Sequence, residues 1–171
     1  MDIRVRFATV ADAALLAELG ERTLRDTFPG GDPQDTDAFV AANFGPGILA
    51  AELEDPRQRY LIAERGATAV GFAQMQEAPA PTGVLGARPL KLARLYVDLP
   101  HIGTGAGALL MARCLELARA GGHDAVWLTV WDQNAHAIAF YERWGFTVRG
   151  ESVVSFGNER PRNLVLALRV A

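Results

Sequence analysis

The sequence predicts an α/β protein of the α+β kind, built on one mixed sheet. The chain has 171 residues, about the length of a single domain. Half of these residues are hydrophobic and 22% are charged, which is enough apolar material for a sizeable core. In the second half, β-rich and helical segments alternate before two β-rich segments end the chain. We therefore expect one domain over residues 1–171, with about six to seven strands and about four flanking helices.

The first half predicts a strand, a set of helices and a hairpin. Leucines spaced at helical intervals follow the first alternating stretch, and a Pro29–Pro33 segment interrupts them. Two β-rich stretches then flank the short turn at 65–68. The expected elements are a strand at 3–7, a helix from Thr9 or Asp12 to about Phe28, weaker helices around 37–44 and 48–54, and strands at 60–64 and 69–76.

The second half has a clearer pattern. Prolines and glycines between 77 and 89 predict an irregular connection, and Gly121-Gly122 is a typical helix stop. The expected elements are a strand at 90–97, a helix at 105–120, a strand at 125–131, a helix at 134–144, and strands at 146–156 and 164–170. This order predicts a parallel or splayed pair at the centre of the sheet and an antiparallel end.

Composition excludes several classes of protein. Cys114 is the only cysteine, which excludes an intrachain disulfide and a cysteine zinc cluster and predicts a cytoplasmic location. Charged and apolar residues alternate over residues 2–7, so we expect neither a signal peptide nor a membrane anchor there. Residues 1–90 carry 8 basic and 13 acidic side chains, and residues 91–171 carry 9 and 7. This distribution lacks the clustered basic residues typical of a nucleic-acid-binding protein.

A glycine-rich loop is the most informative segment. Gly103, Gly105 and Gly107 lie between a predicted strand and a predicted helix, where they leave backbone N–H groups unobstructed. The positive end of the helix adds to these donors, so the loop predicts a phosphate site. The alternative is a tight turn that lets strand and helix pack closely.

The same loop also satisfies the dinucleotide pattern of a Rossmann unit, with Ala108 as its third small residue. Two features oppose this interpretation. Five residues separate the predicted strand from Gly103, and Asp132 lies 27 residues after Gly105, farther than the roughly 20 expected of a ribose-binding acid.

Two motifs in order resemble the GCN5-related N-acetyltransferase (GNAT) family. The first is Q/R-x-x-G-x-G/A, with Gly105 and Gly107 at the glycine positions and Ile102 where the family usually has Gln or Arg. The second is N-x-x-A-x-x-x-Y-x-x-x-G-F, which begins at Asn134 and includes Tyr141. Residues 130–134, Asp55-Pro56 and Gly71-Phe72-Ala73 are also similar to the PaiA-like polyamine acetyltransferase branch.

The resemblance implies a GNAT fold with a splayed central strand pair, and an enzyme that uses acetyl-CoA and no metal. It would move the acetyl group to a primary amine of a small, cationic acceptor by direct attack in a ternary complex. Tyr141 would protonate the sulfur of the coenzyme, and Asn134 would bind the pantetheine arm. The other expected coenzyme contacts are Leu95, Tyr96, Val97, Gly103, Thr104, Gly105, Ala106, Gly107 and Ala108.

Three points stay open at this stage. Many relatives carry a glutamate where this chain has Lys91-Leu92-Ala93, so the proton of the amine would leave through a water chain to Glu77 or Asp132, or the acceptor would arrive partly deprotonated. A non-catalytic acyl-CoA-binding or sensor domain of the same fold is the alternative function, and a homodimer is one possible assembly. The cationic acceptor depends on acids in the first half: Asp32, Asp35, Asp37, Glu52, Glu54 and Asp55.

Overall fold

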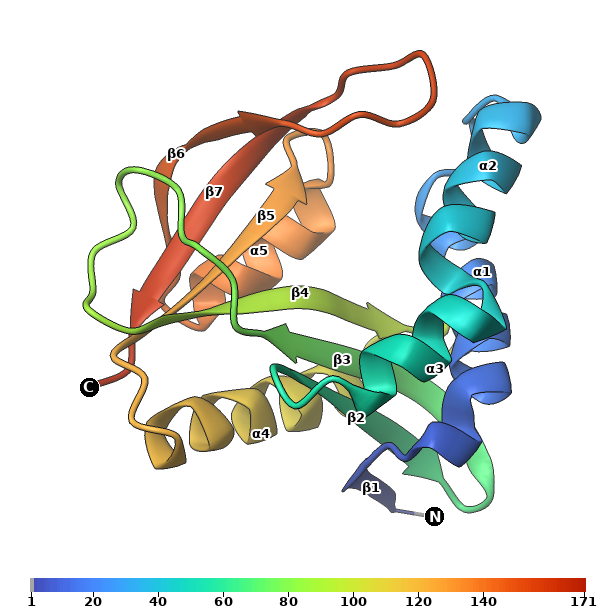
Figure 1. The fold of residues 1–171 in the computed structure, drawn as a ribbon, viewed down its shortest axis with the longest axis horizontal. Coiled ribbons are helices and arrows are strands. Elements are labelled where there is room, and N and C mark those ends of the chain that lie inside the picture. Colours follow the sequence, from blue (N-terminus) through green and yellow to red (C-terminus); the bar gives the residue numbers. More distant parts are fainter. Residues whose placement is uncertain (1) are drawn as a thin grey trace. The chain divides into compact units, whose positions relative to one another are not determined.

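A computed structural model describes residues 2–171 (Figure 1). Its strands form one mixed sheet of seven, in the order β1-β2-β3-β4-β5-β7-β6. The strands are β1 (Ile3–Phe7), β2 (Gln58–Arg65), β3 (Thr68–Gln76), β4 (Pro89–Val97), β5 (Ala125–Trp131), β6 (Thr147–Val153) and β7 (Arg162–Arg169). The α-helices are α1 (Ala13–Thr27), α2 (Pro33–Phe44), α3 (Pro46–Glu54), α4 (Ala106–Ala120) and α5 (Ala135–Arg143). The predicted mixed α/β sheet is therefore confirmed.

The chain divides into two compact units, each made of separate segments. The first unit runs up to Met75 and includes Arg94–Cys114, and the second holds Gln76–Ala93 and Leu115–Ala171. The three division points fall before the last residue of β3, within β4 and within α4, so the chain passes from one unit to the other inside regular elements. The single domain over residues 1–171 stays a prediction.

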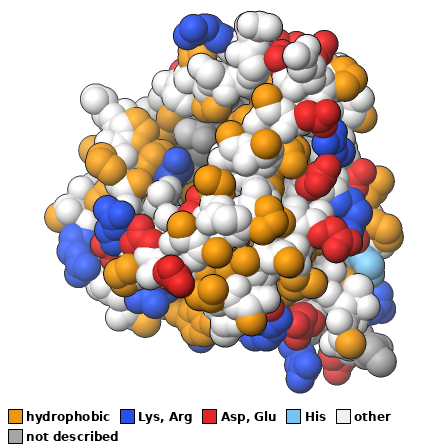
Figure 2. Space-filling view, turned by 45° about the vertical axis from the view of Figure 1, so that its right-hand side comes forward, with side chains coloured by type: hydrophobic (Ala, Val, Ile, Leu, Met, Phe, Trp, Pro, Cys, Tyr) orange, Lys and Arg blue, Asp and Glu red, His pale blue; other side chains and the backbone are white. Residues whose placement is uncertain are grey.

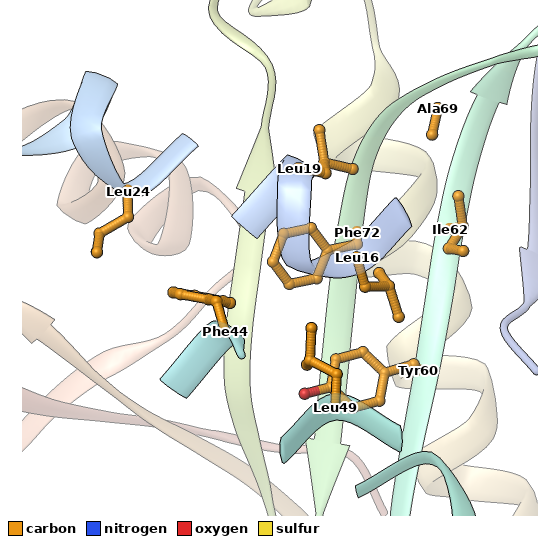
Figure 3. Packing of buried hydrophobic residues seen from close by; sticks show 9 residues of the cluster. All are labelled: Leu16, Leu19, Leu24, Phe44, Leu49, Tyr60, Ile62, Ala69 and Phe72. Atoms are coloured by element: carbon orange, nitrogen blue, oxygen red, sulfur yellow. The ribbon is translucent and has the colours of Figure 1, made fainter. Parts of the chain in front are cut away.

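In the first unit, three helices cover the core side of β2 and β3. Helix α1 is amphipathic and buries one leucine face, and α2 begins with Pro33 after an Asp32 cap that accepts bonds from two backbone N–H groups. Strand β1 pairs antiparallel to β2 along its whole length. Figure 3 shows the core cluster between helices and strands: Leu16, Leu19, Leu24, Phe44, Leu49, Tyr60, Ile62, Ala69 and Phe72.

In the second unit, β5, β7 and β6 lie side by side as antiparallel neighbours (Figure 1). The β5–β7 register runs from Ala125↔Arg169 to Trp131↔Asn163. Strand β4 pairs parallel to β5 over three residues, from Pro89↔Ala125 to Lys91↔Trp127. A short parallel ladder beside an antiparallel end is the predicted layout.

The irregular segment before β4 packs on this sheet. Ala78, Ala80 and Val84 contact the buried cluster that includes Trp127. A Cβ on Gly83, which has a φ of 101°, would lie 2.4 Å from the backbone oxygen of Arg149. The glycine therefore permits a close approach of this segment to β6.

Candidate functional site

The loop between β4 and α4 has a bare backbone surface in the first unit. After the 3₁₀ turn Leu99–His101, Gly103 and Gly105 adopt φ values of 82° and 94°, a region that side chains disfavour. A Cβ placed on either glycine would meet no heavy atom within 4 Å. The glycines are therefore required by backbone conformation, and the space beside them is open to a ligand.

The first turn of α4 supplies donors beside this surface. The N–H of Leu109 donates to the oxygen of Gly105 at 3.0 Å and is the first to bond back to the loop in the α-helical manner. The N–H groups of Ala106, Gly107 and Ala108 precede that bond and lack intrahelical partners, as is usual for a first helical turn. Thr104 differs, because its N–H and hydroxyl both donate to the oxygen of His101, at 3.2 and 2.6 Å. The predicted anion site therefore has its donors at the helix start.

The strand that leads into the loop packs against the core through the side chain of Tyr96. Tyr96 lies 5.7 Å from Phe72, ring centre to ring centre, and burial raises the pKa of its hydroxyl. Ile102, at the position where the family usually has a polar residue, is 45% exposed. The loop thus presents an apolar side chain and backbone donors.

A polar cluster that the sequence analysis missed lies just before this strand segment. The Arg94 guanidinium donates to a Glu52 carboxylate oxygen at 3.1 Å, to the Tyr60 hydroxyl at 2.6 Å and to the Asn43 backbone oxygen at 3.2 Å. It also lies 4.6 Å from the ring centre of Phe44. Burial raises the pKa of Tyr60, whose hydroxyl donates to Glu52. The one available signal was the presence of two basic residues, Lys91 and Arg94, in the otherwise apolar β4.

Most of the acids expected to attract a cation have partners. Asp37 pairs with Arg25 at 2.5 Å, and Glu52 pairs with Arg94. Arg57 donates to Asp55 from its side chain and its backbone N–H, which lowers the pKa of that carboxyl to about 2. On the face in Figure 2, acidic and basic side chains likewise lie next to one another. These acids therefore act mainly as ion pairs and helix caps.

Two of these acids line a cavity. A cavity of about 290 Å³ in the first unit is lined by Glu54, Asp55, Arg59 and Tyr60, among other residues. Its two carboxylates come from the end of α3 and the turn that follows.

The second unit holds the other predicted site residues. Asn134 caps α5, because its side-chain oxygen accepts from the N–H of Ala137 at 3.2 Å. Tyr141, two turns later, is 8% exposed, with ring contacts to Phe140 and Phe146 at 5.5 and 5.8 Å. Asn134 thus has a structural role as a cap, and Tyr141 is held by aromatic packing.

The two candidate proton acceptors also belong to this unit. Asp132 forms an ion pair with Arg162 at 3.5 Å and has an 18% exposed side chain. Glu77 lines a cavity of about 310 Å³ together with Arg88 and His123. Each carboxylate therefore has an arginine in its surroundings. The geometry singles out neither one as the acceptor of the amine proton.

The structure brings together the strand 95–97 and the glycine loop in the first unit, while Asn134 and Tyr141 are fixed within the second. Cys114 is buried, and burial raises its pKa to about 12, which agrees with a core role. Among residues 2–171, no three His, Cys, Asp or Glu side chains are grouped to hold a metal ion. No helix in the same span is both long and apolar enough to cross a bilayer.

Comparison with known proteins gives concordant matches. Residues 20–146 match the profile of the acetyltransferase (GNAT) family. An uncharacterised N-acetyltransferase of Mycobacterium tuberculosis is 31% identical over 158 residues, which cover 92% of this chain and 97% of that protein. The N-alpha-acetyltransferase RimI of the same organism is 31% identical over 141 residues, covering 81% of this chain and 74% of RimI.

Among solved structures, the PaiA N-acetyltransferase of Thermoplasma acidophilum in complex with coenzyme A superposes with a TM-score of 0.81. The match covers 99% of each chain at 18% identity, which shows a shared fold.

Proposed function

The chain belongs to the acetyltransferase (GNAT) family and is an acyltransferase, and on that premise we propose that it moves the acetyl group of acetyl-CoA to a primary amine. The observation that carries the proposal is the open glycine backbone at the start of the 15-residue helix α4. Backbone donors at a helix N-terminus suit the diphosphate of the coenzyme.

The coenzyme would contact backbone more than side chains. Gly105 to Ala108 would face the diphosphate, and Leu95, Tyr96 and Val97 would offer strand N–H and C=O groups to the pantetheine arm. With such contacts, Ile102 would be tolerated, because the first helical turn supplies donors that need no Gln or Arg side chain.

In the proposed reaction, the neutral amine attacks the thioester carbonyl, a C–N bond forms and the C–S bond breaks. The amine would lose one proton through water to Glu77 or Asp132, the departing thiolate would gain one, and the group that donates it would regain a proton from water. We assign the second transfer to Tyr141 as general acid, and the orientation of the pantetheine arm to Asn134. A general acid contributes about 10²–10⁴-fold to the rate.

We expect Tyr141→Phe to lower kcat by about tenfold or more while coenzyme binding stays nearly unchanged, because the phenyl ring keeps the packing and loses only the proton donor. Steady-state kinetics and calorimetry with coenzyme A check this. An unchanged kcat would remove Tyr141 from the mechanism.

For the acceptor, we propose a small cationic amine. The first unit contains 9 basic and 13 acidic side chains, so it stays at −4 however its ion pairs are arranged. Glu54 and Asp55 line its 290 Å³ cavity together with Arg59, and Asp55 pairs with Arg57, so the attraction depends mainly on the net charge of the unit. The likeness to RimI favours a second candidate, the α-amine of a polypeptide.

Release of free thiol from acetyl-CoA in the presence of an amine panel tests the proposal. We expect turnover with diamines and polyamines, and a kcat/KM that falls as salt is added, because screening weakens the attraction of a cation. Turnover only with neutral or acidic amines contradicts the cationic acceptor, and turnover with peptide N-termini favours the second candidate. Binding of coenzyme A without any turnover supports the sensor domain instead.

We also propose a cytoplasmic location, since one buried thiol requires no oxidising compartment.

A further inference from the structure

An ion pair in the first unit links helix α1 to the residue that begins the glycine loop. Arg22 donates from Nε to one carboxylate oxygen of Asp98 at 2.9 Å and from Nη2 to the other at 3.1 Å. Planar, two-point pairing of this kind fixes direction as well as distance. The two residues are 76 positions apart in the sequence, so the pair is a tertiary contact.

Asp98 is fixed on its other sides as well. Its N–H donates to the oxygen of Val70 in β3 at 2.8 Å, and its own C=O accepts the N–H of His101 at 2.8 Å. Asp98 as a whole is only 9% exposed. Its backbone therefore closes the turn that leads into Gly103, and its side chain is held by α1.

We propose that Arg22 is a positioning residue for the coenzyme loop, acting through Asp98. The inference rests on the proposed function of that loop. Loss of the guanidinium leaves a largely buried carboxylate without its cation, and such a group is stabilised again by moving toward water. Movement of Asp98 shifts the turn at 99–101 and, with it, the N–H groups at the start of α4.

The geometry argues against a direct contact of Arg22 with the coenzyme phosphates as its main role. The two Arg22 nitrogens that face Asp98, Nε and Nη2, both donate to its carboxylate, and Nη1 donates to Glu18 at 3.4 Å. The pair with Asp98 cancels most of the charge that a phosphate would sense. Asp98 and Arg22 should therefore behave as one unit.

The test uses the full chain with Arg22→Gln, Asp98→Asn and the double variant. Calorimetry with coenzyme A gives Kd, and steady-state kinetics give KM for acetyl-CoA and kcat. We expect each single variant to raise Kd and KM about tenfold with kcat within twofold, and the double variant to be no worse than the poorer single one. Arg22→Lys, which keeps the charge and loses the two-point geometry, should be intermediate.

Arg6→Gln is the matched control. Arg6 makes the same kind of two-point pair with Asp12, at 2.8 and 2.9 Å, and the side-chain exposures of the two pairs are 39% and 15% against 43% and 12%. This variant should lower Tm at least as much as Arg22→Gln, because Arg6 also bonds Glu64, and should leave the Kd for coenzyme A unchanged.

Two results would overturn the inference. One is an Arg22→Gln variant whose Kd changes no more than that of Arg6→Gln. The other is tighter coenzyme binding by Asp98→Asn, which would mean that a released Arg22 binds phosphate directly. A wild-type protein that fails to bind coenzyme A would instead reject the proposed function. If Arg22→Gln does not fold, Arg22→Lys and Asp98→Asn carry the comparison.

Discussion

Replacing Gly20 with alanine sets helix propensity against packing. Gly20 lies inside α1, where an alanine normally stabilises by about 1 kcal/mol. A Cβ there would lie 2.2, 2.5 and 2.9 Å from three ring atoms of Phe44. That ring cannot move freely, since it is 3% exposed, meets Phe72 edge-on at 6.4 Å and lies under the Arg94 guanidinium at 4.6 Å.

Overpacking of a core costs about 1–3 kcal/mol, and contacts this short point to the upper end. After the helix gain is subtracted, we expect Gly20→Ala to lower the free energy of unfolding by about 2 kcal/mol. For a chain of this length that is roughly 4–8 °C in Tm. Urea unfolding and calorimetry of both variants check the value.

Gly47→Ala is the control, because Gly47 is an exposed residue of α3 with no heavy atom within 4 Å of an added Cβ. It should raise stability by about 0.5 kcal/mol. If Gly20→Ala proves as stabilising as Gly47→Ala, the close packing of α1 on Phe44 is refuted.

Three further substitutions have defined outcomes. Arg94→Met should lower the free energy of unfolding by about 2–4 kcal/mol in urea, because it leaves the carboxylate of Glu52 without its cation; a loss below 0.5 kcal/mol, typical of a surface site, would contradict this. Asp12 has a pKa lowered to about 2 by its bonds with Arg6, so its contribution is complete above about pH 4 and lost as pH falls toward 2. Asp12→Asn should therefore remove about 1 kcal/mol, after solvent screening, from the loss of unfolding free energy between about pH 4 and pH 2. Thermal unfolding of both proteins across that pH range checks this. Gly105→Ala, at a φ of 94°, should weaken coenzyme A binding about tenfold and lower Tm by about 2–8 °C, because it strains the folded loop by about 1–2 kcal/mol; unchanged calorimetric Kd would oppose it.

Local signals explain why the elements were predictable. The Pro29–Pro33 break and the Gly121-Gly122 stop lie at helix ends in the structure. Strand β6 shows the limit of this approach. It was expected over 146–156, and it ends at Val153 because its ladder with β7 ends at the pair Val153↔Arg162. A strand boundary depends on a partner that is distant in the sequence.

Tertiary pairs explain what could not be predicted. Arg94 reaches Glu52 and Tyr60 across 42 and 34 positions, and no periodicity specifies such partners. The position of the glycine loop was predictable because its signal lies in consecutive residues, and its role in coenzyme binding stays a prediction. The mutual placement of that loop and Tyr141 stays a prediction, since it depends on two segments that belong to different units.

Ion pairing changes how acidic residues can select an acceptor. A carboxylate paired with arginine, as Asp37 is with Arg25, acts at a distance as a dipole, and its field falls off faster than that of a charge. The unpaired surplus of the first unit retains the longer range, yet salt screens it beyond about 8 Å under physiological conditions. A cationic acceptor would therefore be attracted by net charge over a short distance and oriented by Glu54 at the 290 Å³ cavity, where Asp55 is paired with Arg57. Selectivity among cations must then come from the shape of the acceptor more than from its charge.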